Sequence, residues 1–321
     1  MAEKIATRHA YGQALAELGK KENILALDAD VSTCTMSCDF GREYPHRFIN
    51  VGIAEANMVG IAAGLSTLGY IPFVHSFAMF SAGRCFEQIR NSLAYPKLNV
   101  KVVGTHAGLS VGEDGATHQC LEDIGIMRTI PGMIVVHPCD GYETKKAVEA
   151  IALHKGPCYL RLGRAALDIV TGKDDYSFEL GKAVTMKDGS DATIIAVGMM
   201  VQAALKAAET LEEDGISVRV LNMHTIKPID TEAIIKAAKE TGVIITAEEH
   251  NIIGGLGSAV TETVTEFFPV PVFRLGSNDT FGQSGNAEQL MDFYGLTDLG
   301  VIEMVKKGLR SKNYLKDVNN K

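Results

Sequence analysis

The segment VGEDGATHQ, residues 111–119, places two acids, a histidine and an amide around two glycines. Asp114 and His118 can exchange hydrogen bonds and protons with a ligand, so they suit a molecule that carries hydroxyl or anionic groups. The same composition is typical of an ordinary solvated turn. The segment alone leaves both interpretations open, and the elements that position it decide between them.

Several expected strands end in further polar residues. These strand-end residues are Asp28, Asp30, His75, His106, His137, Arg161 and Arg164. One histidine at a strand end is usually structural, but three imidazoles and two acids at one edge favour a site. Ligands of open α/β sheets bind beyond the carboxyl ends of the strands. The 111–119 loop follows the strand that ends in His106, so we expect Asp114 and His118 on the same rim.

Hydrophobic periodicity predicts an α/β protein. Apolar runs typical of buried strands, such as 23–30 and 99–106, alternate with helical patterns such as 52–69 and 79–95. We therefore predict two doubly wound domains, each a mostly parallel sheet flanked by helices. The first spans residues 1–168, a polar, glycine-rich linker spans 169–190, and the second domain spans 191–321.

Composition excludes several classes of function. The 321 residues carry a net charge of −8 and contain no tryptophan, which argues against a nucleic-acid partner. No apolar run approaches the roughly 20 residues that span a bilayer, and the N-terminus lacks a signal-peptide pattern, so we expect a cytoplasmic protein. The one close cysteine pair, Cys34 and Cys38, has no nearby histidine to complete a zinc site, and no metal ligands are predicted in this chain.

Three longer segments resemble one family in the correct order. They are FINVGIAEANMVGIAAGL (48–65), THAGLSVGEDGATHQ (105–119) and ITAEEHNIIGGLGSAV (245–260). The sequence resembles the thiamine-diphosphate enzymes of the transketolase type over nearly its whole length. It matches only the C-terminal two-thirds of a full-length member, which comprises the pyrimidine-binding and C-terminal domains.

The resemblance implies a half-site for thiamine diphosphate. Glu55 matches the glutamate that activates the cofactor through its pyrimidine ring; without the motif, a glutamate that complements a helix dipole would be the simpler interpretation. Phe77 and Phe80 match the aromatic pocket for that ring, although such a pair by itself is more often part of the core packing. The sequence departs from the family at Gly83, where members often have a tyrosine.

The resemblance also implies contacts to a sugar phosphate. His106, Arg164 and Arg8 match phosphate-binding positions, for which surface ion pairs are the alternative. Asp114 and His118 match residues that bond substrate hydroxyls and assist proton transfer. Asp30 matches an acid near cofactor and substrate. Three residues, Ser32, Thr33 and Cys34, remain candidates for the one nearest the phosphate.

One family signature is missing. Gly-Asp-Gly, which holds the diphosphate and Mg²⁺ in the N-terminal domain of the family, does not occur in this sequence. The resemblance therefore implies one subunit of a split transketolase, which moves a two-carbon ketol unit between sugar phosphates, as in the pentose phosphate pathway. We expect a separate N-terminal, diphosphate-binding subunit as partner, in an α2β2 assembly.

Three alternatives remain open at this point. The chain could be the β subunit of a 2-oxoacid dehydrogenase, which TAEEHNIIGGLGSAV suits equally well. It could be half of a deoxyxylulose-phosphate synthase, or a catalytically silent binding subunit that kept the fold. The loop GEDGATHQ argues for the sugar-transferring enzyme.

Overall fold

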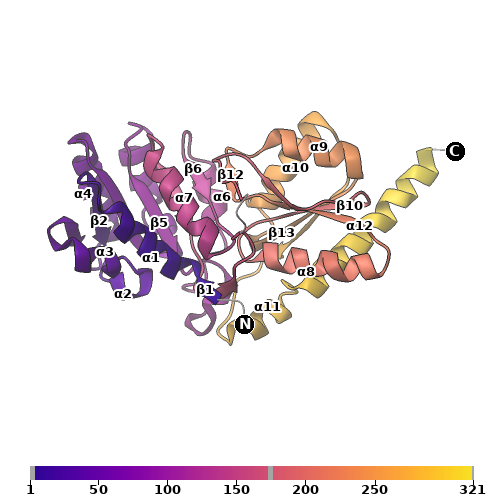
Figure 1. Ribbon diagram of the computed structural model, residues 1–321, viewed down its shortest axis with the longest axis horizontal. Coiled ribbons are helices and arrows are strands. Elements are labelled where there is room, and N and C mark those ends of the chain that lie inside the picture. Colours follow the sequence, from indigo (N-terminus) through magenta and orange to yellow (C-terminus); the bar gives the residue numbers. More distant parts are fainter. Residues whose placement is uncertain (1–3, 173–175, 320–321) are drawn as a thin grey trace.

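Two mostly parallel sheets organise the chain, and helices flank each of them (Figure 1). The computed structural model describes residues 4–172 and 176–319. The two sheets belong to two domains that lie side by side. This architecture confirms the predicted fold class of two doubly wound α/β domains.

The N-terminal domain contains a seven-stranded sheet in the order β12-β6-β7-β5-β4-β2-β3. Its strands are β2 (Ile24–Asp28), β3 (Phe48–Asn50), β4 (Ile71–Phe77), β5 (Lys101–Thr105), β6 (Ile134–Val136), β7 (Cys158–Arg161) and β12 (Thr225–Lys227). Strands β2 to β7 pair in parallel, so their carboxyl ends meet at one edge. Strands β2 and β5 are buried along their whole length, as expected in a parallel sheet covered on both faces.

Short connections and helices surround this sheet. They are α1 (Thr7–Leu18), α2 (Ser32–Thr35), α3 (Cys38–Glu43), η1 (Pro45–Arg47), α4 (Glu55–Thr67), η2 (Met79–Gly83), α5 (Phe86–Gln88), η3 (Ile89–Ala94), η4 (Leu109–Asp114), α6 (Asp123–Arg128) and α7 (Gly141–Leu153). A small antiparallel pair, β1 (Lys4–Ala6) with β8 (Ala166–Asp168), joins the two ends of the domain.

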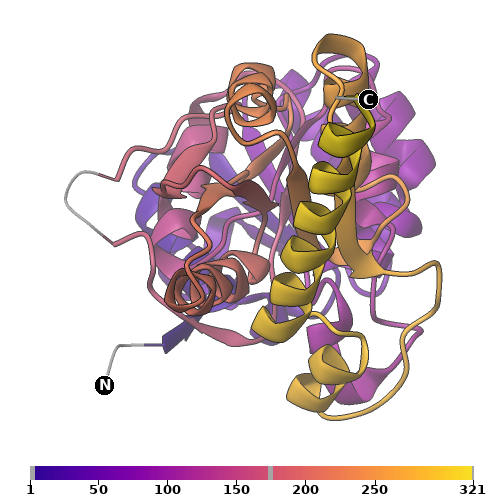
Figure 2. The ribbon, with the colours of Figure 1, turned by 90° about the vertical axis from the view of Figure 1, so that its right-hand side faces the viewer.

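The C-terminal domain contains a five-stranded sheet in the order β14-β13-β10-β11-β9. Its elements are β9 (Val184–Lys187), β10 (Ala192–Ala196), α8 (Met200–Glu213), β11 (Val218–Asn222), α9 (Thr231–Thr241), β13 (Ile244–Asn251), α10 (Leu256–Phe267), β14 (Val272–Ser277), α11 (Ala287–Phe293) and α12 (Asp298–Asn319). Only β9, at one edge, is antiparallel to its neighbour. The long helix α12 packs against this sheet, along β14, β13 and β10, and lies in the foreground of Figure 2. None of the helices within residues 4–172 and 176–319 is both long and apolar enough to cross a membrane.

Two local features differ from the sequence-based prediction. The single helix expected over 79–95 is instead a series of π-helical and α-helical turns, with i→i+5 bonds from Arg84 N to Met79 O and from Tyr95 N to Arg90 O. Strand β9 lies inside the expected linker 169–190, because its backbone completes the edge of the second sheet.

The two domains share a β-sheet and a hydrophobic core. Strand β12 comes from the C-terminal half of the sequence, yet it pairs with β6 and forms an edge of the N-terminal sheet. One cluster of buried apolar residues contains members of both domains, including Met58 and Val74 from the first and Ile195 and Leu256 from the second. The relative placement of the domains is therefore fixed by packing as well as by hydrogen bonds.

A buried arginine completes the contact between the domains. Arg161, at the end of β7, donates from Nε to Asp123 Oδ2 at 2.8 Å, and both side chains are fully buried. It also donates to the carbonyl of Glu249 in β13 at 2.9 Å. Tyr159 donates its hydroxyl to the same oxygen of Asp123 at 2.7 Å. The ion pair therefore links β7, α6 and the C-terminal sheet.

We predict that Arg161→Met lowers the free energy of unfolding by about 3–5 kcal/mol, because it leaves the Asp123 carboxylate buried without its cation. The double variant Arg161→Met/Asp123→Leu should lose less than the sum of the two single variants. Urea unfolding of the chain measures both. Lys182→Met, in the exposed pair with Glu232, is the control and should leave the unfolding midpoint unchanged. If the losses of unfolding free energy in the two single variants add up in the double variant, Arg161 and Asp123 are not energetically coupled.

Candidate active site at the edge of the N-terminal sheet

Four rings gather where β4 and β5 end. Phe77 is the last residue of β4, and Phe80 lies in η2, with the two rings stacked at 6.2 Å between centroids. The His106 ring lies 4.1 Å from Phe77, and the His118 ring lies 5.1 Å from Phe80 with its edge toward it. The structure thus brings together four residues that the sequence analysis named from separate motifs.

Glu55 lies beside this ring cluster and is paired with an arginine. It begins α4 and is buried, with 3% of its surface exposed. Arg84 donates to both carboxylate oxygens, at 2.9 and 2.8 Å, and its guanidinium lies 4.5 Å over the Phe80 ring. The sequence analysis missed Arg84. Its position four residues after Phe80 is the signal that could have indicated it.

His106 is held in an unusual backbone conformation. Its φ is +54°, in the left-handed region that β-branched and bulky residues rarely adopt, and the side chain is buried. Thr105 Oγ1 lies 2.9 Å from Nδ1, and Arg8 lies 3.4 Å from Nε2. Burial, followed by the charges of Arg8, Arg164 and His118, lowers the pKa of His106 to about 3. The ring is therefore neutral at neutral pH.

Arg8 and Arg164 place two positive charges near this neutral ring. Arg8 donates to the carbonyl of Cys34 at 2.8 Å, and its buried Nε has no partner within the described residues. Arg164 donates to the carbonyl of Val111 at 2.5 Å and lies 3.4 Å from Glu113. Burial lowers the pKa of Arg8, and the nearby charge of Arg164 lowers it further, while Cys34 raises it. Two guanidiniums with a free donor form a site suited to an anion.

The 111–119 loop is anchored to the C-terminal domain. Gln119 is buried, and its amide donates to the carbonyls of Leu109, Gly112 and Gln283 at 3.2, 3.2 and 2.9 Å. Its neighbour His118 is half-buried, with Nδ1 2.9 Å from Thr117 Oγ1. The loop is therefore an ordered part of the site rather than an ordinary solvated turn.

Two predicted acids lie outside the ring cluster. The Asp114 side chain is exposed and makes no hydrogen bond or ion pair with any residue that the structure describes. Asp30 has a φ of +66° and accepts from Asn50 Nδ2 at 2.9 Å. Both stay predictions as ligand-binding residues. Asp30 nevertheless follows β2 and Asp114 lies in the loop after β5, so both are at the same edge of the sheet.

Other strand-end residues have structural partners. Asp28 is buried and accepts from Val31 N, Thr35 Oγ1 and Ser37 Oγ at 2.7 to 2.8 Å, which shapes the turn after β2. His75 donates from Nδ1 to the Leu27 carbonyl at 2.7 Å and accepts from the Tyr11 hydroxyl. By shaping the turn after β2, Asp28 also positions the Cys34 carbonyl, which lies in this turn and accepts a hydrogen bond from Arg8.

Gly83, where the family often has a tyrosine, lies against Met79. A Cβ at Gly83 would overlap the end of the Met79 side chain. Met79 therefore occupies the space next to Gly83.

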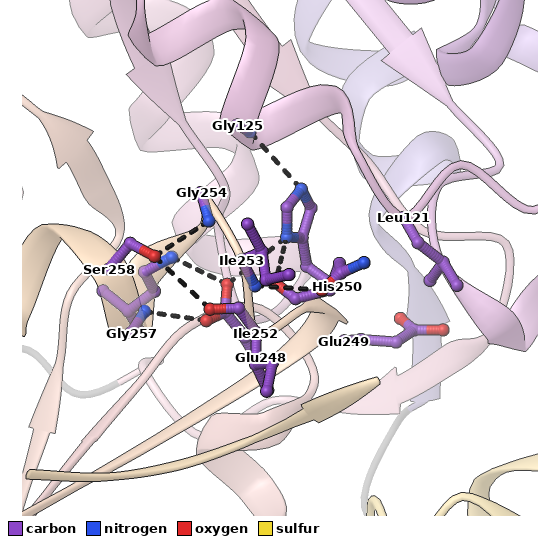
Figure 3. Close-up of polar contacts among 12 residues, drawn as sticks. Leu121, Gly125, Glu248, Glu249, His250, Ile252, Ile253, Gly254, Gly257 and Ser258 are labelled. Atoms are coloured by element: carbon purple, nitrogen blue, oxygen red, sulfur yellow. Dashed lines mark hydrogen bonds and ion pairs between the residues drawn. The ribbon is translucent and has the colours of Figure 1, made fainter. Parts of the chain in front are cut away.

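A second polar cluster joins the domains behind the site (Figure 3). Glu248 accepts from the backbone N–H groups of Leu256 and Gly257 at the start of α10, both at 2.7 Å. His250 Nε2 accepts from Gly125 N at 3.3 Å, which connects β13 to α6. Burial raises the pKa of Glu248 to about 7 and lowers that of His250 to about 4. Glu248 therefore holds the start of α10 to β13 within the C-terminal domain, and His250 links that domain to α6.

The fold consists of two doubly wound domains, and a carboxyl, stacked rings and cations lie at one sheet edge. These features are typical of ligand-binding α/β proteins. Comparison with known families identifies the family. Residues 3–169 match the model "Transketolase, pyrimidine binding domain", and residues 181–301 match "Transketolase, C-terminal domain". The chain belongs to the transketolase family, which confirms the resemblance inferred from the sequence.

Individual relatives agree with this assignment. The chain is 45% identical over 308 residues to an apulose-4-phosphate transketolase subunit of Phocaeicola vulgatus, covering 94% of this chain and 98% of that protein. It is 43% identical to the 6-deoxy-6-sulfo-D-fructose transketolase subunit of a Clostridium species, covering 96% and 95%. A solved structure described as "Split gene transketolase, inactive beta4 tetramer" is 48% identical, covers 97% of this chain and 100% of that chain, and superposes with a TM-score of 0.88.

The charges around His106 lead to a testable prediction. Between pH 8 and pH 5 its ring should stay neutral, as measured by its NMR chemical shifts in the chain alone. Arg8→Met should raise its pKa, since it removes a neighbouring positive charge. Saturating inorganic phosphate should also raise it, because a bound anion stabilises the imidazolium.

Arg42→Met removes an exposed arginine that is paired with Asp39 and serves as the control. It should leave the titration of His106 unchanged. Titration of His106 near pH 6.5 in the unsubstituted chain would contradict the neutral ring between the two arginines.

Proposed function

We propose that this chain is one subunit of a split, thiamine-diphosphate-dependent transketolase that transfers a two-carbon ketol unit between sugar phosphates. The observation that carries the proposal is the buried Glu55 carboxyl beside the stacked rings of Phe77 and Phe80, with Arg8, His106 and Arg164 on the same edge. A carboxyl next to apolar aromatic surface fits an aminopyrimidine, and the cations fit a sugar phosphate.

Thiamine diphosphate, when bound, supplies a carbanion equivalent that can add to a sugar carbonyl. Glu55 is proposed to hold the pyrimidine ring nitrogen and to exchange a proton with it, which requires a carboxyl shielded from water. Phe77 and Phe80 would form the apolar wall of that half-site. We place the Mg²⁺ and diphosphate ligands on the partner chain, in line with the missing Gly-Asp-Gly motif.

The remaining residues are proposed to bind and orient the sugar. Arg8 and Arg164 would bind its terminal phosphate, with neutral His106 as a hydrogen-bond partner. Asp114 and His118 would contact the sugar hydroxyls and assist proton transfer, and Asp30 would lie near the cofactor and substrate. The sugars in the relatives' names, apulose 4-phosphate and 6-deoxy-6-sulfo-D-fructose, both carry an anionic group, which supports an anionic sugar for this chain.

Arg84 adds a requirement to this proposal. Its guanidinium donates to both oxygens of Glu55 and also covers the Phe80 ring, so it lies where the pyrimidine ring of the proposed cofactor would meet these two side chains. About half of the Arg84 side chain is exposed, so it has room to move into solvent. We propose that cofactor binding displaces it.

The proposed assembly is an α2β2 complex with a diphosphate-binding chain, in the cytoplasm. The solved relative is described as an inactive tetramer of β chains, which supports the expectation that this type of chain needs another subunit for turnover. The sugar-transferring interpretation is preferred over a silent binding protein because Glu55 and the ring cluster are present together.

We predict that the purified chain alone shows negligible ketol transfer at any magnesium concentration. Mixing it with a diphosphate-binding transketolase subunit from the same organism should restore turnover, measured as formation of an aldose phosphate from a ketose phosphate. Transfer from a 2-oxoacid instead of a ketose phosphate would favour the dehydrogenase alternative. Full turnover by this chain alone would exclude the split-enzyme proposal.

We predict that Glu55→Gln in the reconstituted enzyme slows exchange of the thiazolium C2 proton by about 10²–10⁴-fold, the usual contribution of a positioned proton-transfer group. Deuterium exchange followed by acid quench and NMR measures it. Glu87→Gln, which changes an exposed carboxyl in α5 three residues after Arg84, is the matched control and should leave the rate unchanged. An unchanged rate in Glu55→Gln would remove Glu55 from cofactor activation.

A further inference from the structure

A segment of the C-terminal domain, residues 282–287, lies directly against the 111–119 loop. Gln119 donates to the Gln283 carbonyl at 2.9 Å, and Ser284 Oγ donates to the Glu113 carbonyl at 2.6 Å. Helix α11, which begins at Ala287, packs against η4. The two segments are about 165 residues apart in the sequence, so this contact is made only when both domains are in place.

The glycines of the loop are the points of closest approach. Gly112 has a φ of +84°, and a Cβ there would lie 3.3 Å from the Gly285 carbonyl oxygen. Gly115 has a φ of +75°, and a Cβ there would lie 3.4 Å from Ser284. On the opposite side, a Cβ at Gly282 would overlap Gln119 Oε1. The spacing of glycines in VGEDGATHQ therefore matches the shape of the facing domain.

The facing segment is itself held in place. Ser277 Oγ donates to the Thr280 carbonyl at 3.0 Å, and the Tyr294 hydroxyl donates to the Phe281 carbonyl at 2.9 Å. Asn286 caps α11 by accepting from Glu288 N at 3.0 Å. The segment can therefore act as a fixed surface for the loop.

The side chains proposed to contact the sugar differ in their local support. Asp114 has no partner among the described residues, whereas the His118 ring contacts Thr117 and lies edge-on against the Phe80 ring. The position of Asp114 is therefore set by the backbone of the loop, which also carries His118. Two hydrogen bonds connect that backbone to the C-terminal domain. One is at Glu113, just before Asp114, and the other is at Gln119, just after His118.

We propose that the C-terminal domain positions the sugar-binding loop, with Gly282 and Ser284 as positioning residues. This inference rests on the proposed function, because it assigns the C-terminal domain a role in binding the sugar. Neither residue touches the reacting atoms. Each acts on Asp114 and His118 through the loop backbone, where a displacement of about 1 Å is enough to weaken substrate positioning strongly.

The test compares three variants of the C-terminal domain. Gly282→Ala should displace Gln119, since Gly282 has no positive φ and the backbone itself tolerates alanine. Ser284→Ala removes one hydrogen bond to the loop. Gln283→Ala is the matched control, because it keeps the backbone carbonyl that Gln119 uses and changes only an exposed side chain.

Two readouts are measured. In the chain alone, hydrogen–deuterium exchange of the peptide covering 108–119 should be faster in Gly282→Ala and Ser284→Ala than in Gln283→Ala. In the reconstituted enzyme, the KM for the sugar phosphate should rise about 10- to 100-fold in Gly282→Ala and about 2- to 10-fold in Ser284→Ala. The dissociation constant of thiamine diphosphate, measured by fluorescence quenching, should stay unchanged because Gly282 and Ser284 contact the loop at Gln119 and Glu113 and not at the proposed pyrimidine wall.

Three results would overturn the inference. The first is unchanged exchange of the loop peptide in both variants. The second is an equal loss of cofactor and sugar binding, which would indicate general unfolding. The third is an unchanged KM in Gly282→Ala while Asp114→Ala raises it. If Asp114→Ala also leaves the KM unchanged, the proposed function of the loop fails instead, so the two failures are distinguishable.

Discussion

The polar contact between the two domains depends on one buried ion pair, Arg161 with Asp123. A buried guanidinium is tolerated only when its donors find acceptors, and here the acceptors come from the Asp123 carboxylate and from the Cys120 and Glu249 carbonyls. Asp123, through its charge, raises the pKa of Arg161 above its ordinary value against the opposing effect of burial, so the charge persists. Because these acceptors belong to both domains, the hydrogen bonds of one side chain hold β7 and α6 to β13 of the C-terminal sheet.

A similar constraint explains how an acidic protein can hold two positive charges close together. The chain carries a net charge of −8, yet Arg8 and Arg164 lie close enough for each to lower the pKa of His106. Their repulsion is tolerated because both guanidiniums are held by backbone carbonyls, and because His106 stays neutral between them. A site preorganised in this way already has its positive charge in place, so an anion needs little rearrangement to bind.

Much of this could be predicted from the sequence, and the missing parts have a common physical reason. Apolar runs and strand-end residues predicted the two parallel sheets, and short motifs led to Glu55, Phe77, Phe80, His106 and His118, most of which lie together. Arg84 was missed because its partner Glu55 is 29 residues away, so the sequence shows its spacing from Phe80 but not the salt bridge itself. Strand β12 was missed for a similar reason, since three residues of one domain complete the sheet of another. Local sequence patterns predict helices and strands, whereas contacts between residues far apart in the sequence depend on how the whole chain packs.

Under the proposed function, the pairing of Glu55 with Arg84 lets half of a cofactor site be stable by itself. A buried carboxylate without a partner costs several kcal/mol, so a chain that binds its cofactor only together with another subunit would need a substitute cation. Arg84 supplies it with two hydrogen bonds and rests on Phe80, while about half of its side chain stays in solvent. Under the proposed function, the free energy of this pair opposes cofactor binding to the chain alone. Diphosphate and metal contacts from a second chain would overcome that cost, which couples cofactor binding to assembly.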